Sequence, residues 1–114
     1  MLNILYLPIF AKKLKEYSKK NPNLKKDYQK LLDTIQTNPT NAIYIKENVY
    51  KIRLQNSSLN KGKSSGYRVY YFYKTDKNTI ILLYIYSKNK QISLSDNILD
   101  KLIKEAKIFF WIIH

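Results

Sequence analysis

The sequence predicts an α+β fold, on the basis of three patterns in its apolar residues. Over residues 9–37 they recur every three or four positions, as on the buried face of a helix. Over residues 43–87 they recur every second position, as in strands, and a second helical pattern follows near the C-terminus. The 114 residues suffice for one hydrophobic core, so we expect a single domain over residues 1–114.

The first part of the chain predicts a strand and two helices. Residues 2–7 form a short apolar strand, and the helical pattern begins at Ile9. Asn21 and Pro22 separate the helices, because Asn is a good N-cap and Pro is tolerated at the first helical position. The second helix ends before Pro39, since a residue that precedes proline is disfavoured in the helical region. The two apolar stripes consist of Phe10, Leu14, Tyr17, Leu24, Tyr28, Leu31, Leu32 and Ile35.

The middle of the chain predicts an antiparallel sheet. Residues 49–55 alternate between apolar and basic side chains, as in a half-buried strand. Residues 66–73 and 79–87 form two more strands, and the second of these is apolar on both faces, as a central strand is. Residues 43–45 are compatible with an additional short strand, and the polar residues 56–65 form a loop.

A final helix is predicted near the C-terminus, capped by Ser93 or Ser95. The expected order is therefore β-α-α-β-β-β-α, an antiparallel sheet with an N-terminal helix pair on one face and a C-terminal helix. The aromatic tail, residues 109–113, is too apolar to be left in water. It either docks onto the sheet or forms a partner-binding patch.

The composition excludes several classes of protein. There is no cysteine and His114 is the one histidine, so we expect no disulfide framework, no metal site and no cofactor. The apolar runs are too short to span a bilayer, and the N-terminus has its apolar residues before its lysines, the reverse of a secretory signal. Residues 62–64, GKS, match only the end of a P-loop and precede a strand. We expect a cytoplasmic protein with no membrane partner.

The charge distribution favours a polyanionic partner. The formal net charge is +13, and the two arginines among the 21 basic residues, Arg53 and Arg68, both lie in the middle of the chain. No acidic residue occurs over residues 48–75. Clustered cations bind phosphate backbones because they release condensed counterions.

Strand alternation brings several cations together. Lys51 and Arg53 share one face of their strand, and Arg68 lies on the neighbouring strand. If that face is the one opposite the helix pair, the three converge into a phosphate-binding surface, where the planar arginine fork contacts phosphate bidentately. The alternative is an ordinary solvated sheet face, which has the same alternation. Further residues expected near this surface are Lys61, Lys63, Tyr70, Tyr86, Lys88 and Lys90.

Three motifs carry a resemblance to a known family. They are KIRL at residues 51–54, GKSSGYRVYY at residues 62–71 and YSKNK at residues 86–90. In this order they resemble the motif series of the RelE/ParE toxin superfamily, and particularly its HigB/RelE-type branch. The family's tyrosine beyond the last motif has no counterpart in residues 91–97.

The resemblance implies a RelE-like fold and the toxin of a bacterial toxin–antitoxin pair, a ribosome-dependent endoribonuclease that cuts mRNA in the ribosomal A site. It implies a cognate antitoxin, the ribosome and mRNA as partners, and operator DNA only through the antitoxin complex. The catalytic residues would be Lys51, Arg53, Lys63, Arg68 and Lys88, and the RNA-binding residues Lys61, Tyr70, Tyr86 and Lys90. Two alternatives remain open at this point: a ParE-type inhibitor of DNA gyrase, and a catalytically inactive relative that binds RNA or the ribosome.

Overall fold

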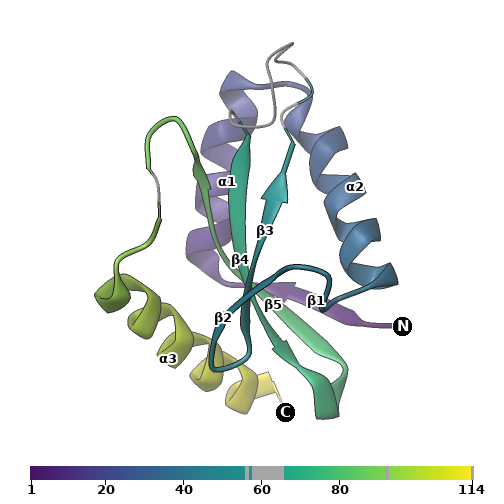
Figure 1. Cartoon of the computed structure of the whole chain (residues 1–114), viewed down its shortest axis with the longest axis vertical. Coiled ribbons are helices and arrows are strands. Elements are labelled where there is room, and N and C mark those ends of the chain that lie inside the picture. The colour runs from purple at the N-terminus through teal and green to yellow at the C-terminus, as the bar shows by residue number, and fades with distance from the viewer. Residues whose placement is uncertain (56, 58–65, 92, 114) are drawn as a thin grey trace.

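A computed structural model describes residues 1–55, 57, 66–91 and 93–113, and in these ranges the predicted α+β class is confirmed (Figure 1). A five-stranded sheet has helices on both of its faces. The elements are β1 (Asn3–Tyr6), α1 (Pro8–Lys20), α2 (Leu24–Thr37), β2 (Ile43–Lys46), β3 (Val49–Leu54), β4 (Tyr67–Lys74), a short 3₁₀ turn (Thr75–Lys77), β5 (Thr79–Ser87) and α3 (Asp96–Ile113).

The sheet has the strand order β1-β5-β4-β3-β2 and differs from the expectation in two details. β1 pairs with β5 in parallel, with Asn3 opposite Thr79, so the sheet is mixed rather than wholly antiparallel. Residues 43–46 form an edge strand, β2, which adds a fourth strand after the helix pair. Apolar alternation indicates which face a side chain occupies but not the direction of the strand beside it, which explains the first difference. The predicted central position of β5 is confirmed.

The connection between β2 and β3 is a two-residue hairpin turn. Glu47 and Asn48 have φ angles of 46° and 68°, both in the left-handed region. A type I′ turn requires this conformation at both central residues, and Asn adopts it readily. The turn thus fixes how β2 continues the sheet beyond β3.

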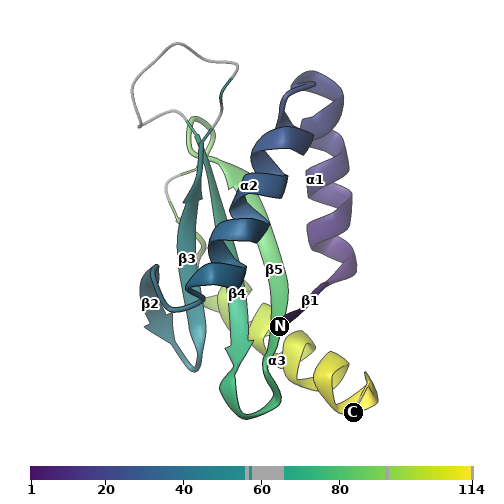
Figure 2. The ribbon, with the colours of Figure 1, turned by 90° about the vertical axis from the view of Figure 1, so that its right-hand side faces the viewer.

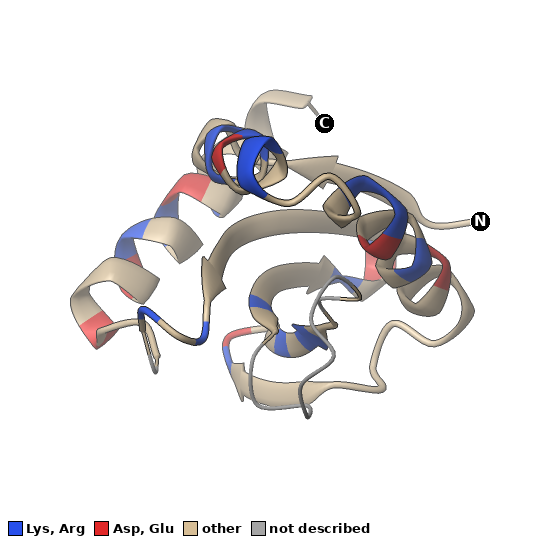
Figure 3. Ribbon diagram, turned by 90° about the horizontal axis from the view of Figure 1, so that it is seen from above, with Lys and Arg blue, Asp and Glu red and all other residues tan. Residues whose placement is uncertain are grey.

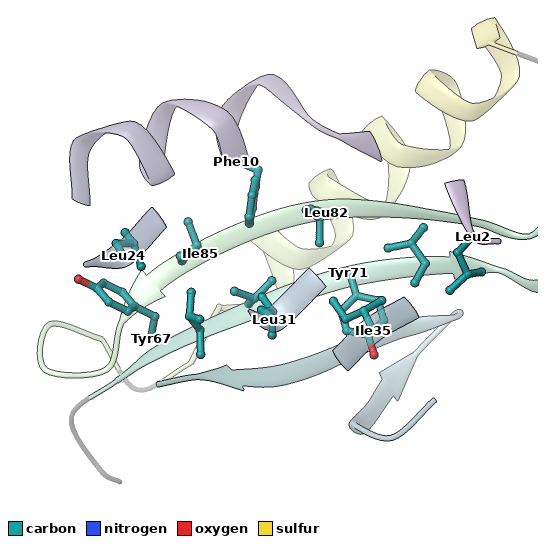
Figure 4. Close-up of a cluster of buried hydrophobic side chains, with 12 residues drawn as sticks. Leu2, Phe10, Leu24, Leu31, Ile35, Tyr67, Tyr71, Leu82 and Ile85 are labelled. Carbon is teal, nitrogen blue, oxygen red and sulfur yellow. The ribbon is translucent and has the colours of Figure 1, made fainter. Parts of the chain in front are cut away.

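The helix pair covers one face of the sheet, as predicted (Figure 2). Asn21 Oδ1 accepts a hydrogen bond from the Asn23 N–H at 3.2 Å in the turn between the helices, so α2 begins two residues later than predicted, at Leu24. Figure 4 shows the core that this packing buries. Each large apolar side chain that is fully buried there contributes about 1.5–3 kcal/mol. The cluster includes Leu2, Phe10, Leu24, Leu31, Ile35, Leu54, Tyr67, Val69, Tyr71, Ile80, Leu82 and Ile85.

Helix α3 packs on the opposite face of the sheet through Leu99, Leu102, Ile103 and Ala106. Of the two predicted caps, Ser95 is the one observed, since its Oγ accepts a hydrogen bond from the Ile98 N–H at 3.3 Å.

The aromatic tail is the last part of α3 rather than a separate segment. Phe109 and Phe110 are partly buried against the α3-side core, whereas Trp111 is 82% exposed and Ile112 is also exposed. Docking of the tail, the default expectation, is therefore confirmed for the two phenylalanines and wrong for the residues that follow. None of the helices in the described part of the chain has the length and apolar character that crossing a bilayer requires.

Candidate functional site

Three of the predicted cations, Lys51, Arg53 and Arg68, share the sheet face opposite the helix pair. Leu54 belongs to the core under the helices, so Arg53, its neighbour on β3, faces the other way. Arg53 lies directly opposite Arg68 of β4, and Lys51 lies opposite Tyr70 two residues further along. We call Lys51, Arg53 and Arg68 the cationic face. Helix α3 covers the far half of this side of the sheet, where β3 begins and β4 ends, and leaves the half with the arginines uncovered by a helix.

The register across three strands arranges these residues in two rows. Arg53, Arg68 and Tyr86 form one row, and Lys51, Tyr70 and Tyr84 form the next. Neighbouring strands are about 4.8 Å apart, so each row is roughly 10 Å wide. This width suits one phosphate group and its immediate neighbours.

Arg68 is a nearly buried cation, with 9% of the residue exposed. Its Nη1 donates a hydrogen bond to the backbone carbonyl of Tyr67 at 3.1 Å. Burial, and then the like charge of Arg53, lower the pKa of Arg68 from its usual range, but a guanidinium keeps its charge at neutral pH.

No carboxylate neutralises the cationic face within the described residues. The ion pairs among the described residues lie elsewhere and join Lys46 to Asp100, Lys74 to Asp76 and Lys107 to Glu47. A half-enclosed cation without an anionic partner is costly unless a ligand supplies the negative charge. The arrangement therefore favours an anionic ligand over a merely solvated surface.

Tyr70 and Tyr86 lie beneath the cations rather than beside them. They are 3% and 1% exposed, and their ring centroids are 6.1 Å apart. Neither ring offers a face to a base, so the expected RNA-binding role of Tyr70 and Tyr86 does not include stacking. Lys51 Nζ lies 5.7 Å from the centroid of the Tyr70 ring, a cation–π contact that holds the lysine over the sheet.

The hydroxyl of Tyr86 is not a proton acceptor at neutral pH. Burial raises its pKa, and the neighbouring Tyr70, which also hydrogen-bonds to it, raises the pKa further. A tyrosine in this state stays protonated. Its contribution is to support the arginine row from below.

The chain after β5 is held at the same end of the sheet. The Lys88 N–H donates to the carbonyl of Gly66 at 3.0 Å, and the Lys90 N–H donates to the carbonyl of Ser87 at 3.1 Å. Gly66 is two residues before Arg68, so the Lys88 backbone lies beside the start of the strand that bears Arg68. Lys61 and Lys63, the predicted loop cations, lie outside the described residues.

Gly66 is required by a close approach of two backbones. A Cβ atom at this position would lie 2.6 Å from the Leu54 carbonyl oxygen. Only glycine allows β3 and β4 to come this close where the arginine row begins.

The sequence does not predict the position of two residues around this site, Tyr84 on the side of the cationic face and Asp27 on the side of the helix pair. Tyr84 lies opposite Tyr70 in the same register that pairs Tyr86 with Arg68, and the β4–β5 register shifts only beyond this pair, between Tyr70 and Tyr71. Asp27 of α2 is buried, and its Oδ2 accepts hydrogen bonds from the N–H and hydroxyl of Ser57 at 2.9 and 3.0 Å. Asp27 and Arg53 also line a hollow of about 280 Å³ between α2 and β3. No group of three or more His, Cys, Asp or Glu side chains in the described ranges is arranged to hold a metal ion.

The comparisons with known proteins identify the fold. No protein-family model matches the sequence, and no curated protein is significantly similar to it. A chain of the intact E. coli RelBE toxin–antitoxin complex superposes with a TM-score of 0.56 at 18% identity, over 75% of this chain and 94% of that one. A free E. coli RelE mutant with two arginine-to-alanine substitutions gives 0.58 at 18% identity, over 91% and 96%. The isolated E. coli RelE toxin gives 0.57 at 17% identity, over 93% and 99%. The chain therefore has the fold of the RelE toxin, as the three sequence motifs implied.

Proposed function

We propose that this protein is the toxin of a toxin–antitoxin pair and acts in the cytoplasm as a ribosome-dependent endoribonuclease that cuts mRNA in the ribosomal A site. The observation that carries the proposal is the direct opposition of Arg53 and Arg68, with which no carboxylate of the described residues forms an ion pair. The RelE fold and the three motifs support the same reading.

The proposed reaction is attack of a ribose 2′-oxygen on the adjacent phosphorus. The 2′-hydroxyl loses its proton, the new O–P bond forms, the bond to the 5′-oxygen breaks, and that oxygen takes up a proton. The products are a 2′,3′-cyclic phosphate and a free 5′-hydroxyl. In the intermediate the extra negative charge lies on the non-bridging oxygens, and preorganised cations stabilise it. Arg68 and Arg53 have this role.

The proton transfers fall to lysines. Tyr86 stays protonated because of its raised pKa, and the one histidine of the sequence is the terminal residue. Lys51, whose Nζ lies near the Tyr70 ring, is assigned as the base: as the neutral amine it accepts the proton of the 2′-hydroxyl. Lys88, whose backbone lies beside Gly66, is assigned as the acid: as the ammonium it donates the proton that the 5′-oxygen takes up. Lys90, after β5, is assigned a further phosphate contact, and Lys61 and Lys63, outside the described residues, keep the roles that the motif resemblance implies.

The proposed partners follow from the same surface. One of the matching solved structures is a toxin–antitoxin complex, and an antitoxin of this protein would present acidic residues to a chain of net charge +13. Operator DNA would be bound only through that complex.

The test is cleavage of a defined mRNA, once naked and once programmed on ribosomes, mapped by primer extension. Cuts only on the ribosome are expected, and Arg68→Ala should abolish them. The matched control is Arg68→Lys, which keeps the charge but loses the bidentate fork, and should retain a small fraction of the activity. Circular dichroism of both variants checks that the fold is kept. Full activity of Arg68→Ala would remove Arg68 from the mechanism, and absence of cleavage by the wild type, with inhibition of DNA gyrase in a supercoiling assay, would replace the proposal by the ParE-type function.

A further inference from the structure

The turn between the two N-terminal helices carries a second group of cations. Lys19 and Lys20 end α1, and Lys25 and Lys26 lie in the first turn of α2. All four are exposed. We call them the interhelical lysines.

Two hydrogen bonds dock this turn at the end of the sheet where the cationic face lies. Asn21, 7% exposed, donates through Nδ2 to the Tyr67 hydroxyl at 3.3 Å. The Ser87 N–H donates to the Tyr17 hydroxyl at 3.1 Å. Tyr67 immediately precedes Arg68, and Ser87 immediately precedes Lys88, so the turn is held against the same two strand ends. Figure 3, seen from above, shows Lys and Arg positions both on the strands and on the helix pair beside them.

Helix stability favours two of the interhelical lysines and disfavours the other two. Cations in the last turn of a helix, such as Lys19 and Lys20, complement the negative end of its dipole. Lys25 and Lys26 are at the positive end of α2, where cations are unfavourable. The one acidic residue in that turn, Asp27, is buried and hydrogen-bonded to Ser57. The two lysines therefore oppose helix stability, which indicates a ligand with negative charge.

We propose that the interhelical lysines bind the sugar–phosphate backbone of RNA outside the cleavage site. This inference rests on the proposed function, because it extends the path of the bound RNA from the arginine row across the end of the sheet to the helix pair. An RNA backbone fits better than an acidic protein segment because the two hydrogen bonds hold the turn at the strand ends next to Arg68 and Lys88. A chain of regularly spaced phosphates can pass from the arginine row around this end of the sheet to the lysines.

The experiment compares Lys25→Gln/Lys26→Gln with Lys101→Gln/Lys104→Gln. The second pair removes the same charge from exposed positions on α3, away from the interhelical turn (Figure 1). Binding of a fluorescent single-stranded 2′-O-methyl RNA, which cannot be cut at the modified hydroxyl, is measured from low to moderate salt. The slope of log K against log salt should fall by about 1.4 for the first variant, two contacts at about 0.7 each, and the affinity on the order of tenfold near 0.1 M salt. The control should keep the wild-type slope.

A thermal melt separates this role from a structural one. Removal of two cations from the positive end of α2 should leave the midpoint unchanged or raise it, so weaker RNA binding would not arise from unfolding. Equal loss of RNA affinity in both variants would overturn the inference, since net charge alone would then explain it. An unchanged salt slope in Lys25→Gln/Lys26→Gln would also overturn it. So would a variant that binds a polyglutamate peptide more weakly but binds RNA as the wild type does. The binding assay does not depend on cleavage, so an inactive wild type would overturn the proposed function and leave this inference to be decided by the slopes.

Discussion

Arg53 and Arg68 lie directly opposite each other on β3 and β4, so two like charges occupy a cross-strand position where opposite charges would stabilise the sheet. The repulsion between the two charges affects Arg68. Burial is the larger cause that lowers the pKa of Arg68, and the positive charge of Arg53 is the second. The pair is therefore a cost to the fold, and a bound phosphate would relieve it. This predicts opposite effects on stability and on binding.

Arg53→Gln should stabilise the free protein by about 0.5 kcal/mol, because it removes a like-charge cross-strand pair. The same change should weaken RNA binding and reduce the dependence of binding on salt. Urea unfolding and a salt series of RNA binding measure the two effects. A variant that is less stable than the wild type would show that Arg53 has a structural partner.

Gly66→Ala should destabilise the protein by about 2 kcal/mol, since a new Cβ at 2.6 Å from the Leu54 carbonyl oxygen would force β3 and β4 apart. RNA cleavage should fall as well, because the displaced strand start bears the arginine row. The urea midpoint and the cleavage rate are the readouts, with Thr75→Ala at an exposed position as the control. Wild-type stability in Gly66→Ala would mean that the two strands do not approach as closely as described.

Tyr71→Phe should lower stability by about 1 kcal/mol at neutral pH, because the Tyr71 hydroxyl donates a partly buried hydrogen bond to the Pro39 carbonyl at 2.6 Å. Burial raises the pKa of Tyr71 from 10.0 to about 12. The unfolded state then releases a proton between pH 10 and 12 that the folded state keeps, so this stabilisation is complete below pH 10 and is lost as the pH rises towards 12. Urea unfolding at a series of pH values should show a shallower alkaline loss for Tyr71→Phe. Identical slopes for the two proteins would contradict the raised pKa. RNA binding should not change, since Tyr71 belongs to the core under the helix pair.

Trp111, the one tryptophan of the sequence, should report contacts of the end of α3. At 82% exposure its fluorescence should have the long-wavelength maximum of an indole in water and should be quenched freely by acrylamide. Addition of a partner that covers the tail should shift the maximum to shorter wavelength. A short-wavelength maximum in the free protein that moves on dilution would instead show that the tail joins two copies.

The sequence predicts the cationic face because successive side chains of a strand alternate between its two faces. Residues 49–55 show the two-residue period that places Lys51 and Arg53 on one face, and Arg68 lies directly opposite Arg53 once β4 pairs with β3. The same reasoning does not predict how deeply a side chain is buried, because burial depends on the other elements that pack against it. Tyr86 was expected to be available to RNA because it lies near basic residues, but α3-side packing and Tyr70 enclose it. The register shift of the β4–β5 pair between Tyr70 and Tyr71 is equally invisible in the sequence, because it depends on how two strands pair and not on either strand alone.

The parallel pairing of β1 with β5 also has a consequence for folding. Asn3 and Thr79 are partners although they lie far apart in the sequence, whereas β3, β4 and β5 pair with strands next to them in the chain. Closing so long a loop has a large entropic cost, and contacts of high sequence separation slow folding. β1 is synthesised before β5, so it must wait for its partner until residues 79–82 have left the ribosome.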